Sequence, residues 1–177
     1  MGHFKETGFK GGVHLVKSPV EVEKVAEQMC GKTLVTKQSG EEGLPCNCVY
    51  IVQKISIEKE FYLSITLDRK AGAPVFIYSP AGGMSIEDVA HSNPEKIFKI
   101  KVDTNKGLDI EELLKAADNL GLKDQRSDVA FMFNHLYDCF IHRDCDLIEI
   151  NPLVLTSDGK VVAADSKITI DDNARFR

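Results

Sequence analysis

Long apolar segments are missing from this chain of 177 residues. No apolar run approaches the roughly 18 residues that a membrane-spanning helix needs, and no apolar segment lies near the start. We therefore expect neither a spanning helix nor a secretory signal, and no membrane partner.

An excess of positive charge is missing as well. The formal net charge is −5 at pH 7, and a protein that binds the phosphate backbone of nucleic acids is normally basic. We expect no nucleic-acid partner.

The cysteines do not form a disulfide framework. There are five, an odd number, in scattered places, which is not the pattern of a small secreted domain. The spacing of Cys46 and Cys48 does not fit a zinc knuckle. We predict buried or unreactive thiols in a reducing, intracellular compartment.

What is present is typical of a folded domain. Hydrophobic residues make up 43% of the chain and charged residues 28%. This length allows one or two compact units, and no repeat or low-complexity linker divides them.

The pattern of apolar residues predicts strands followed by helices. A helix should begin after the N-cap Ser18, with Pro19 in its first position, and end at Gly31. Further helical segments are expected at 85–90, 109–120 and 124–143, and strands at 11–16, 33–37, 48–54, 60–68 and 75–78. Turn-rich connections between the strands, beside separate helices, indicate an α+β fold with an antiparallel sheet.

The last part of the chain predicts a hairpin with a polar face. Side chains alternate along a strand, so Ile148 and Ile150 should face the core while Glu149 and Asn151 face the other way. These polar residues are also common on solvated strand faces, and that reading stays open.

The turn of this hairpin determines what lies opposite Asn151. A three-residue loop at 157–159, with Gly159 in the left-handed conformation, would pair Asn151 with Asp165. Side chains directly opposed in a sheet are about 5 Å apart at Cβ. An amide oxygen and a carboxylate could therefore share a hard cation, for which Mg²⁺ is suitable.

Several separate segments, in the same order and register, resemble the β subunits of succinyl-CoA synthetases (succinate–CoA ligases). They are residues 8–14, 31–38, 59–63, 67–69, 82–90, 148–153, 165–168 and 171–177. The resemblance implies an ATP-grasp fold, with residues 1–50 as the remnant of an incomplete first subdomain. Residues 51–177 would form the second subdomain, which carries the metal-binding hairpin.

The resemblance also implies a reaction. In this family a nucleoside triphosphate phosphorylates a histidine of the partner α subunit, and the phosphohistidine drives formation of succinyl-CoA from succinate and coenzyme A, reversibly. Asn151 and Asp165 match the Mg²⁺ ligands, and Glu149 matches a glutamate that meets the partner's histidine. His135 lies among helical apolar residues and His142 near a helix end, so both are expected to be structural, and in this family the phosphorylated histidine belongs to the partner.

The nucleotide, ATP or GTP, would bind near the middle of the chain. The matching positions are Gly11, Gly12, Val52, Gln53, Ile55 and Glu60, with Glu60 as the hydroxyl acceptor. Residues near Val52 and Gln53 differ from the acidic residue found there in many relatives, so the base preference stays open. Gly82 and Gly83 could support a flexible loop near the phosphates, but two glycines before a helix cap are more often only a turn.

The residues leave other classes of protein open. The chain could belong to another acyl-CoA synthetase, of the malate–CoA ligase or ATP-citrate lyase type, or be a non-catalytic interaction module. Family members are well over twice as long, so we expect a fragment that does not turn over substrate alone. The compartment would be the mitochondrial matrix in a eukaryote or the cytoplasm in a bacterium.

Overall fold

The chain forms two compact units that divide between Lys54 and Ile55. The computed structural model describes residues 2–174 and 176. The first unit contains β1 (His3–Phe4), α1 (Pro19–Met29), β2 (Lys32–Val35) and β3 (Leu44–Cys46).

The first unit is a three-stranded antiparallel sheet, in the order β1-β2-β3, with the single helix α1. The helix begins where the sequence predicts. Ser18 Oγ accepts the Glu21 amide at 3.3 Å, and Pro19 fills the first helical position, where its missing N–H costs nothing. The Glu21 carboxylate accepts the Lys17 amide at 2.7 Å and secures the approach to the helix.

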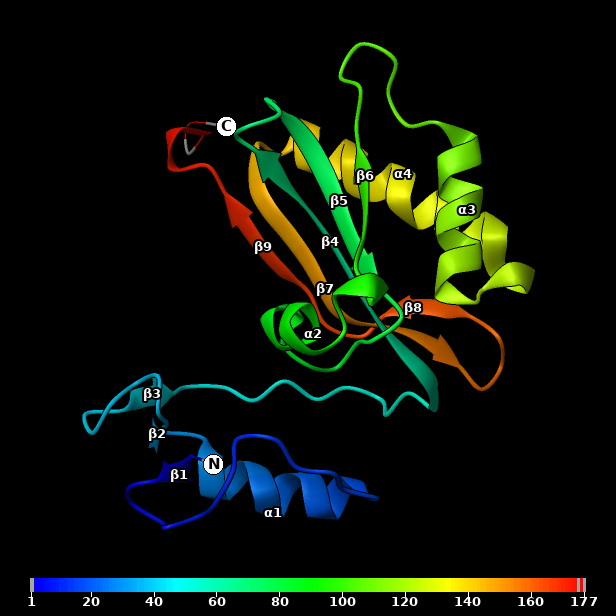
Figure 1. Cartoon of the computed structure of the whole chain (residues 1–177). Helices are drawn as coiled ribbons and strands as arrows, with labels where there is room; N and C mark the ends of the chain where they lie inside the picture. Colours follow the sequence, from blue (N-terminus) through cyan, green and yellow to red (C-terminus); the bar gives the residue numbers. More distant parts are fainter. Residues whose placement is uncertain (1, 175, 177) are drawn as a thin grey trace. The chain divides into compact units, whose positions relative to one another are not determined.

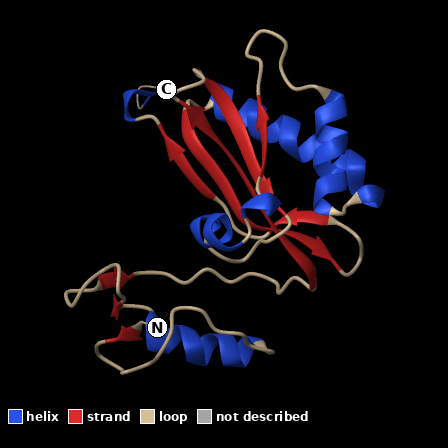
Figure 2. Cartoon of the chain, viewed as in Figure 1, coloured by secondary structure: helices blue, strands red, loops and turns tan. Residues whose placement is uncertain are grey.

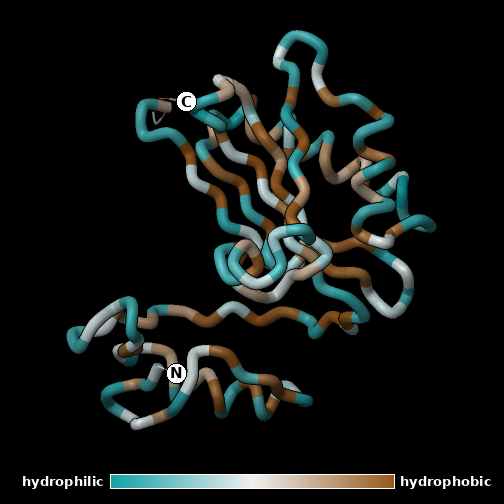
Figure 3. Tube along the Cα trace, in the orientation of Figure 1, coloured by the Kyte–Doolittle hydropathy of each residue, from teal (hydrophilic) through white to brown (hydrophobic). Residues whose placement is uncertain are grey.

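Two predicted strands are wrong. Residues 11–16 and 48–54 form no strand, and Figure 2 shows the connection between β3 and β4 as a long loop. Much of this connection is hydrophobic (Figure 3), but its Tyr50 is 89% exposed. In the other segment, residues 11–16, Val13 is 90% exposed. Apolar composition favours extended backbone, whereas a strand also needs a partner strand, and neither segment has one within the described residues.

The second unit is built on a six-stranded antiparallel sheet with the order β6-β5-β4-β7-β8, in which β9 also pairs with β7. Its elements are β4 (Ile57–Asp68), β5 (Ala73–Ser79), α2 (Ile86–Ser92), β6 (Phe98–Lys101), α3 (Ile110–Leu120), α4 (Arg126–His142), β7 (Cys145–Thr156), β8 (Val161–Ala163) and β9 (Lys167–Ile170). Short 3₁₀ turns lie at Pro94–Lys96, Lys123–Gln125 and Asp172–Ala174. The predicted α+β class is confirmed.

One face of this sheet carries the core. Helices α3 and α4 lie together along that side (Figure 1), and their apolar residues pack with Leu63, Phe76 and Ile148 of the strands. Phe133 of α4 is fully buried, with its ring 4.8 Å from that of Phe76. Burying a large apolar side chain contributes roughly 1.5–3 kcal/mol, so this packing fixes which way every residue of β4 and β7 faces.

Among the helices of the described residues, none has the length and apolar character needed to cross a membrane.

Candidate functional site

The turn that closes the β7–β8 hairpin is the one predicted. Gly159 has φ +82°, and its amide donates to the Thr156 carbonyl at 2.9 Å. The Thr156 amide donates to the Lys160 carbonyl, also at 2.9 Å, so three residues form the loop. Gly159 is suited to this place because a left-handed φ is strained for residues with a side chain.

The register that this turn sets places Asn151 opposite Asp165. Leu153 pairs with Ala163 on β8, and Glu149 pairs with Lys167 on β9, in the same register. Between the two paired segments, the Ala164 amide donates to the Pro152 carbonyl at 3.1 Å. The register on both sides therefore brings Asn151 level with Asp165, at the point where β8 has ended and β9 has not begun.

A β-bulge changes the course of β7 at the same point. Pairing with β4 shifts between Phe61–Leu153 and Leu63–Ile150, so Asn151 and Pro152 together lie opposite one residue of β4. The peptide bond between these two residues is cis. Bulges are frequent beside functional sites, where they redirect a side chain.

Alternation along β7 holds up to the bulge, as predicted. Ile148 and Ile150 are 1% and 3% exposed and belong to the core under α3 and α4. Glu149 and Asn151 are half-buried, on the opposite face of the strand.

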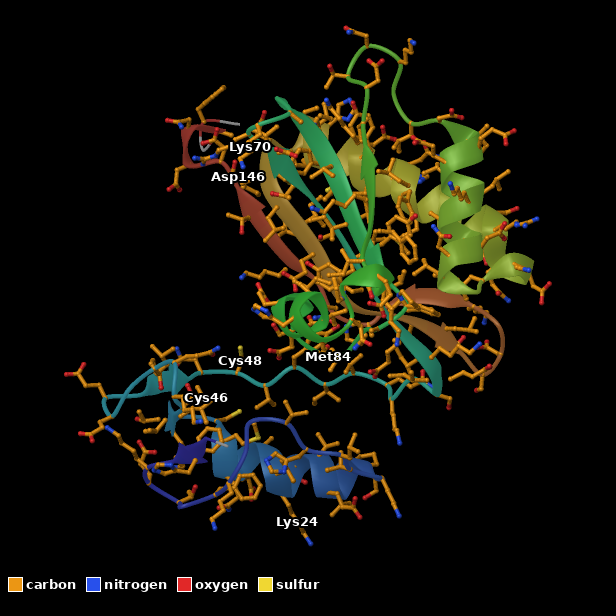
Figure 4. All side chains as sticks on the ribbon, in the orientation of Figure 1. Lys24, Cys46, Cys48, Lys70, Met84 and Asp146 are labelled. Carbon is orange, nitrogen blue, oxygen red and sulfur yellow. The ribbon has the colours of Figure 1, made fainter. Side chains whose placement is uncertain are left out.

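The side-chain amide of Asn151 is held at both ends by the segment before α2. The Gly83 amide donates to Asn151 Oδ1 at 3.0 Å, and Asn151 Nδ2 donates to the Met84 carbonyl at 3.0 Å. We call residues 82–84 the glycine clamp; Met84 is labelled in Figure 4. Two hydrogen bonds fix the amide plane and so the direction of its oxygen.

The glycine clamp also lies against Glu60 on β4. The Gly82 amide donates to the Glu60 carbonyl at 3.2 Å, and a Cβ on Gly82 would lie 2.4 Å from backbone atoms of Phe61. A Cβ on Gly83 would lie 2.1 Å from Glu60 Oε2. The clamp therefore joins Glu60 and Asn151, two residues that the sequence assigns to one site.

The sequence interpretation missed this function of the clamp. A Gly-Gly pair before a helix is usually a turn, and the residues joined here are 67 and 68 positions apart in the chain. The available signal is that Gly83 has φ +71°, in a region that favours glycine.

Tyr62 and Ser64 were also missed. Ser64 pairs with Glu149 across the strands, is 1% exposed, and donates to the Ile77 carbonyl at 3.4 Å. Burial raises the pKa of Tyr62, the nearby Glu149 and Glu87 carboxylates add to the rise, and a hydrogen bond with Ser64 opposes it. A neutral phenol thus lies near Glu149. The polar residues that alternate along β4 could have indicated from the sequence that Tyr62 and Ser64 share a face.

Of the predicted nucleotide positions, Gly12 and Val52 come together in the first unit. Both line a mostly apolar cavity of about 490 Å³, beside residues such as Met29. Val52 is 66% exposed, and Gln53 lies outside the lining. Gly11 has φ +88°, and its amide donates to the Gly2 carbonyl at 2.9 Å. Ile55 and Glu60 belong to the second unit.

The donors at the Asn151–Asp165 position suit a hard cation. Asp165 is exposed and its Oδ1 accepts the Ser166 amide at 2.8 Å, which leaves further acceptor capacity on the carboxylate. No group of three or more His, Cys, Asp or Glu side chains in residues 2–174 and 176 could hold a metal. Two oxygens completed by water and phosphate fit Mg²⁺ better than Zn²⁺, which prefers nitrogen and sulfur.

The two histidines of α4 make hydrogen bonds within their own helix. Nδ1 of His135 lies 2.9 Å from the Phe131 carbonyl, and Nδ1 of His142 lies 2.8 Å from the Asp138 carbonyl. Both contacts agree with structural roles.

Comparison with known proteins gives close relatives in sequence. The chain is 44% identical over 177 residues to "Succinate--CoA ligase [GDP-forming] subunit beta, mitochondrial" of Dictyostelium discoideum, covering 99% of this chain and 42% of that protein. It is 45% identical over 172 residues to the ADP-forming mitochondrial β subunit of the same organism, covering 97% and 39%. The ADP-forming β subunit of Brucella anthropi is 46% identical over 179 residues, covering 99% and 45%. The chain thus spans less than half the length of these relatives.

A likeness to solved structures concerns the fold alone. ATP citrate lyase from Methanothrix soehngenii, solved with citrate and coenzyme A, matches with a TM-score of 0.64 at 20% identity, over 99% of this chain and 39% of that one. The family model described as "ATP-grasp domain" matches residues 3–155. The chain therefore belongs to the ATP-grasp domain family.

Proposed function

We propose that this chain is the nucleotide- and magnesium-binding part of the β subunit of a succinate–CoA ligase. Such an enzyme interconverts succinate, coenzyme A and a nucleoside triphosphate with succinyl-CoA, the diphosphate and phosphate. The proposal draws on the names of the relatives, which are 44–46% identical to nearly the whole chain. The α subunit, as the partner that carries the phosphorylated histidine, is part of the proposal.

The observation that carries the proposal is the arrangement around the glycine clamp. Glu60 and Asn151 come from different strands and touch the same segment, with Asp165 opposite Asn151. A hydroxyl acceptor next to a pair of hard oxygen ligands is what a magnesium–nucleotide complex requires. Phosphoryl transfer depends mainly on such positioning and on neutralised phosphate charge.

Each residue of the site has a proposed role. Asn151 and Asp165 would hold Mg²⁺, which when bound neutralises charge on the phosphates. Glu60 would accept a nucleotide hydroxyl, while Val52, Gln53 and Ile55 would contact the base through backbone and apolar atoms. Gly11 and Gly12 would let the backbone approach the phosphates closely.

Glu149 would orient the partner's histidine. Its carboxylate is half-buried, on the polar face of β7 that also presents Asn151. A carboxylate beside an imidazole favours the cationic ring and fixes which nitrogen carries the proton. The neutral Tyr62 phenol nearby adds no charge of its own to this face.

The choice between ATP and GTP is not decided by similarity. Two relatives from one organism, one ADP-forming and one GDP-forming, are 45% and 44% identical to this chain. The compartment would follow the source: the mitochondrial matrix, as the names of the Dictyostelium relatives indicate, or the bacterial cytoplasm.

The function is tested in a complete αβ enzyme that contains this chain. Glu149→Gln should slow phosphorylation of the partner's histidine by roughly 10²-fold or more, the scale of a general acid–base or orienting group, with nucleotide affinity unchanged. Single-turnover transfer from labelled ATP or GTP measures the rate, and calorimetry measures the affinity. Glu58→Gln, which neutralises an exposed carboxylate of β4, is the control. An unchanged rate in Glu149→Gln would remove this residue from the reaction.

A further inference from the structure

Three of the five cysteines lie together in the first unit, although the sequence separates them. Cys30 caps the C-terminus of α1, Cys46 ends β3, and Cys48 follows two residues later. Figure 4 labels Cys46 and Cys48 at β3 and on the segment after it. Cys30 and Cys46 are half-buried and Cys48 is exposed.

Backbone geometry sets the separation of Cys30 and Cys46. The amide of Gly31, the residue after Cys30, donates to the Cys46 carbonyl at 2.8 Å. Two Cα atoms that flank one such hydrogen bond lie on the order of 6 Å apart. Disulfides join residues whose Cα atoms are about 4.4–6.8 Å apart, and this pair falls in that range.

The electrostatics agree with this proximity. Burial raises the pKa of the Cys46 thiol, and the neighbouring Cys30 and then Cys48 thiols raise it further. Because the thiolate is the reactive form, any oxidation of Cys46 should become faster as the pH rises.

Cys46 and Cys48 are less well placed for each other. Residues two apart on an extended segment are separated by the intervening backbone, and Cys46 Sγ points to the Cys48 carbonyl oxygen at 3.5 Å. A metal is not favoured either, because the described residues include no group of three His, Cys, Asp or Glu side chains that could hold one.

We propose that Cys30 and Cys46 are a thiol-oxidation site that forms a reversible disulfide with a small-molecule disulfide as oxidant. The Cys30 thiolate attacks one sulfur of oxidised glutathione, and one glutathione thiolate leaves. The Cys46 thiolate then attacks Cys30 Sγ, the mixed disulfide breaks, and the second glutathione thiolate leaves. The two cysteines lose two electrons and two protons, which reduce the oxidant to two thiols.

The disulfide would tie the end of α1 to β3 at the wall of the apolar cavity. Cys46, Met29, Gly12 and Val52 all line that cavity. Oxidation would therefore fix the wall that two of the proposed nucleotide positions share. The chemistry itself does not depend on nucleotide binding, so the site and the proposed function can fail separately.

The test is oxidation of the folded 177-residue chain with oxidised glutathione, followed by alkylation and peptide mass mapping. We expect a peptide linked through Cys30 and Cys46 as the main product of the first unit, formed faster at higher pH and reversed by dithiothreitol. Cys48→Ser is the matched control and should keep the linkage. Cys30→Ser and Cys46→Ser should each abolish it.

Three results would overturn the proposal. They are a Cys46–Cys48 linkage as the main product, loss of the linkage in Cys48→Ser, and glutathione left on single cysteines with no internal disulfide. Circular dichroism of each variant shows whether it is folded. If a serine variant does not fold, the wild-type chain still decides, because the linkage should dominate in the folded chain and lose its preference in urea.

Discussion

Gly83 lies between Glu60 and Asn151 in the candidate site. Its amide donates to Asn151 Oδ1, and its Cα lies against the Glu60 carboxylate. Its φ of +71° is unfavourable for other residues. The site therefore depends on a residue that has no chemistry of its own.

Gly83→Ala should separate this role from ordinary backbone strain. A left-handed alanine costs about 1–2 kcal/mol of stability, and the added Cβ would displace the Glu60 carboxylate, which is the mobile end of a side chain. Gly72→Ala is the matched control, since Gly72 has φ +60° and nothing within 4 Å of an added Cβ. Urea unfolding should show similar losses for both variants, whereas calorimetry should show weaker nucleotide binding only for Gly83→Ala. Equal affinities would mean that the clamp does not position Glu60.

Glu6 should make the stability of the folded chain depend on pH. Hydrogen bonds from the Thr33 amide and the Thr33 hydroxyl, both at 2.8 Å, lower the pKa of this exposed carboxyl below its ordinary value. A carboxyl with a lowered pKa stabilises the folded state above its unfolded pKa and loses that effect as the pH falls through the folded pKa.

Thermal unfolding measured from neutral pH down through the region below 4.5 should show this loss for the wild type. Glu6→Gln should make the unfolding temperature of the first unit depend less on pH. Glu41→Gln, in the same unit, is the control and should leave that pH dependence as it is in the wild type. Parallel curves for wild type and Glu6→Gln would contradict the prediction.

At the scale of the elements, β7 serves both the core and the site. Its inward residues pack under α4, and its outward residues supply Glu149 and Asn151. A bulge at Asn151 and the shared register of β8 and β9 bring Asp165 opposite. The packing under α4 therefore determines where the polar side chains lie.

Helix α4 offers a matched pair of substitutions to test that packing. Phe133 is fully buried with its ring 4.8 Å from Phe76, so Phe133→Ala should cost about 3–5 kcal/mol of unfolding free energy. Phe131, two residues earlier, is 63% exposed, and Phe131→Ala should change stability by about 0.5 kcal/mol or less. Urea unfolding of both variants measures the difference, and comparable losses would show that this face of α4 is not the core face.

The sequence predicts local features of the fold better than contacts between distant segments. The Ser157–Gly159 turn, the alternation of β7 and the cap of α1 follow from nearby residues, and all three are confirmed. The predicted strand at 48–54 is wrong because apolar residues indicate extended chain but cannot supply a partner strand. The clamp depends on hydrogen bonds between the Asn151 side chain and the backbone of remote residues. The approach of Cys30 to Cys46 depends on the backbone hydrogen bond from Gly31 to Cys46. No local sequence pattern reveals either contact.

At the scale of the whole molecule, the chain divides into two units that hold different parts of the predicted nucleotide site. Gly11, Gly12, Val52 and Gln53 belong to the first, and Ile55 and Glu60 belong to the second. The resemblance to the family implies an ATP-grasp domain with two α+β subdomains. The proposed assignment of the units to those two subdomains remains a prediction.

The proposed magnesium site of Asn151 and Asp165 can be tested by calorimetry of ATP and GTP binding with and without Mg²⁺. Removing a residue that holds a metal should weaken metal-dependent binding at least about tenfold. The matched control is Asp146→Ala, which removes another exposed carboxylate, from β7.

Wild type and Asp146→Ala should bind nucleotide more tightly when Mg²⁺ is present. Asp165→Ala should bind with the same, weaker affinity whether or not Mg²⁺ is added. A magnesium dependence in Asp165→Ala equal to that of the wild type would contradict the magnesium site.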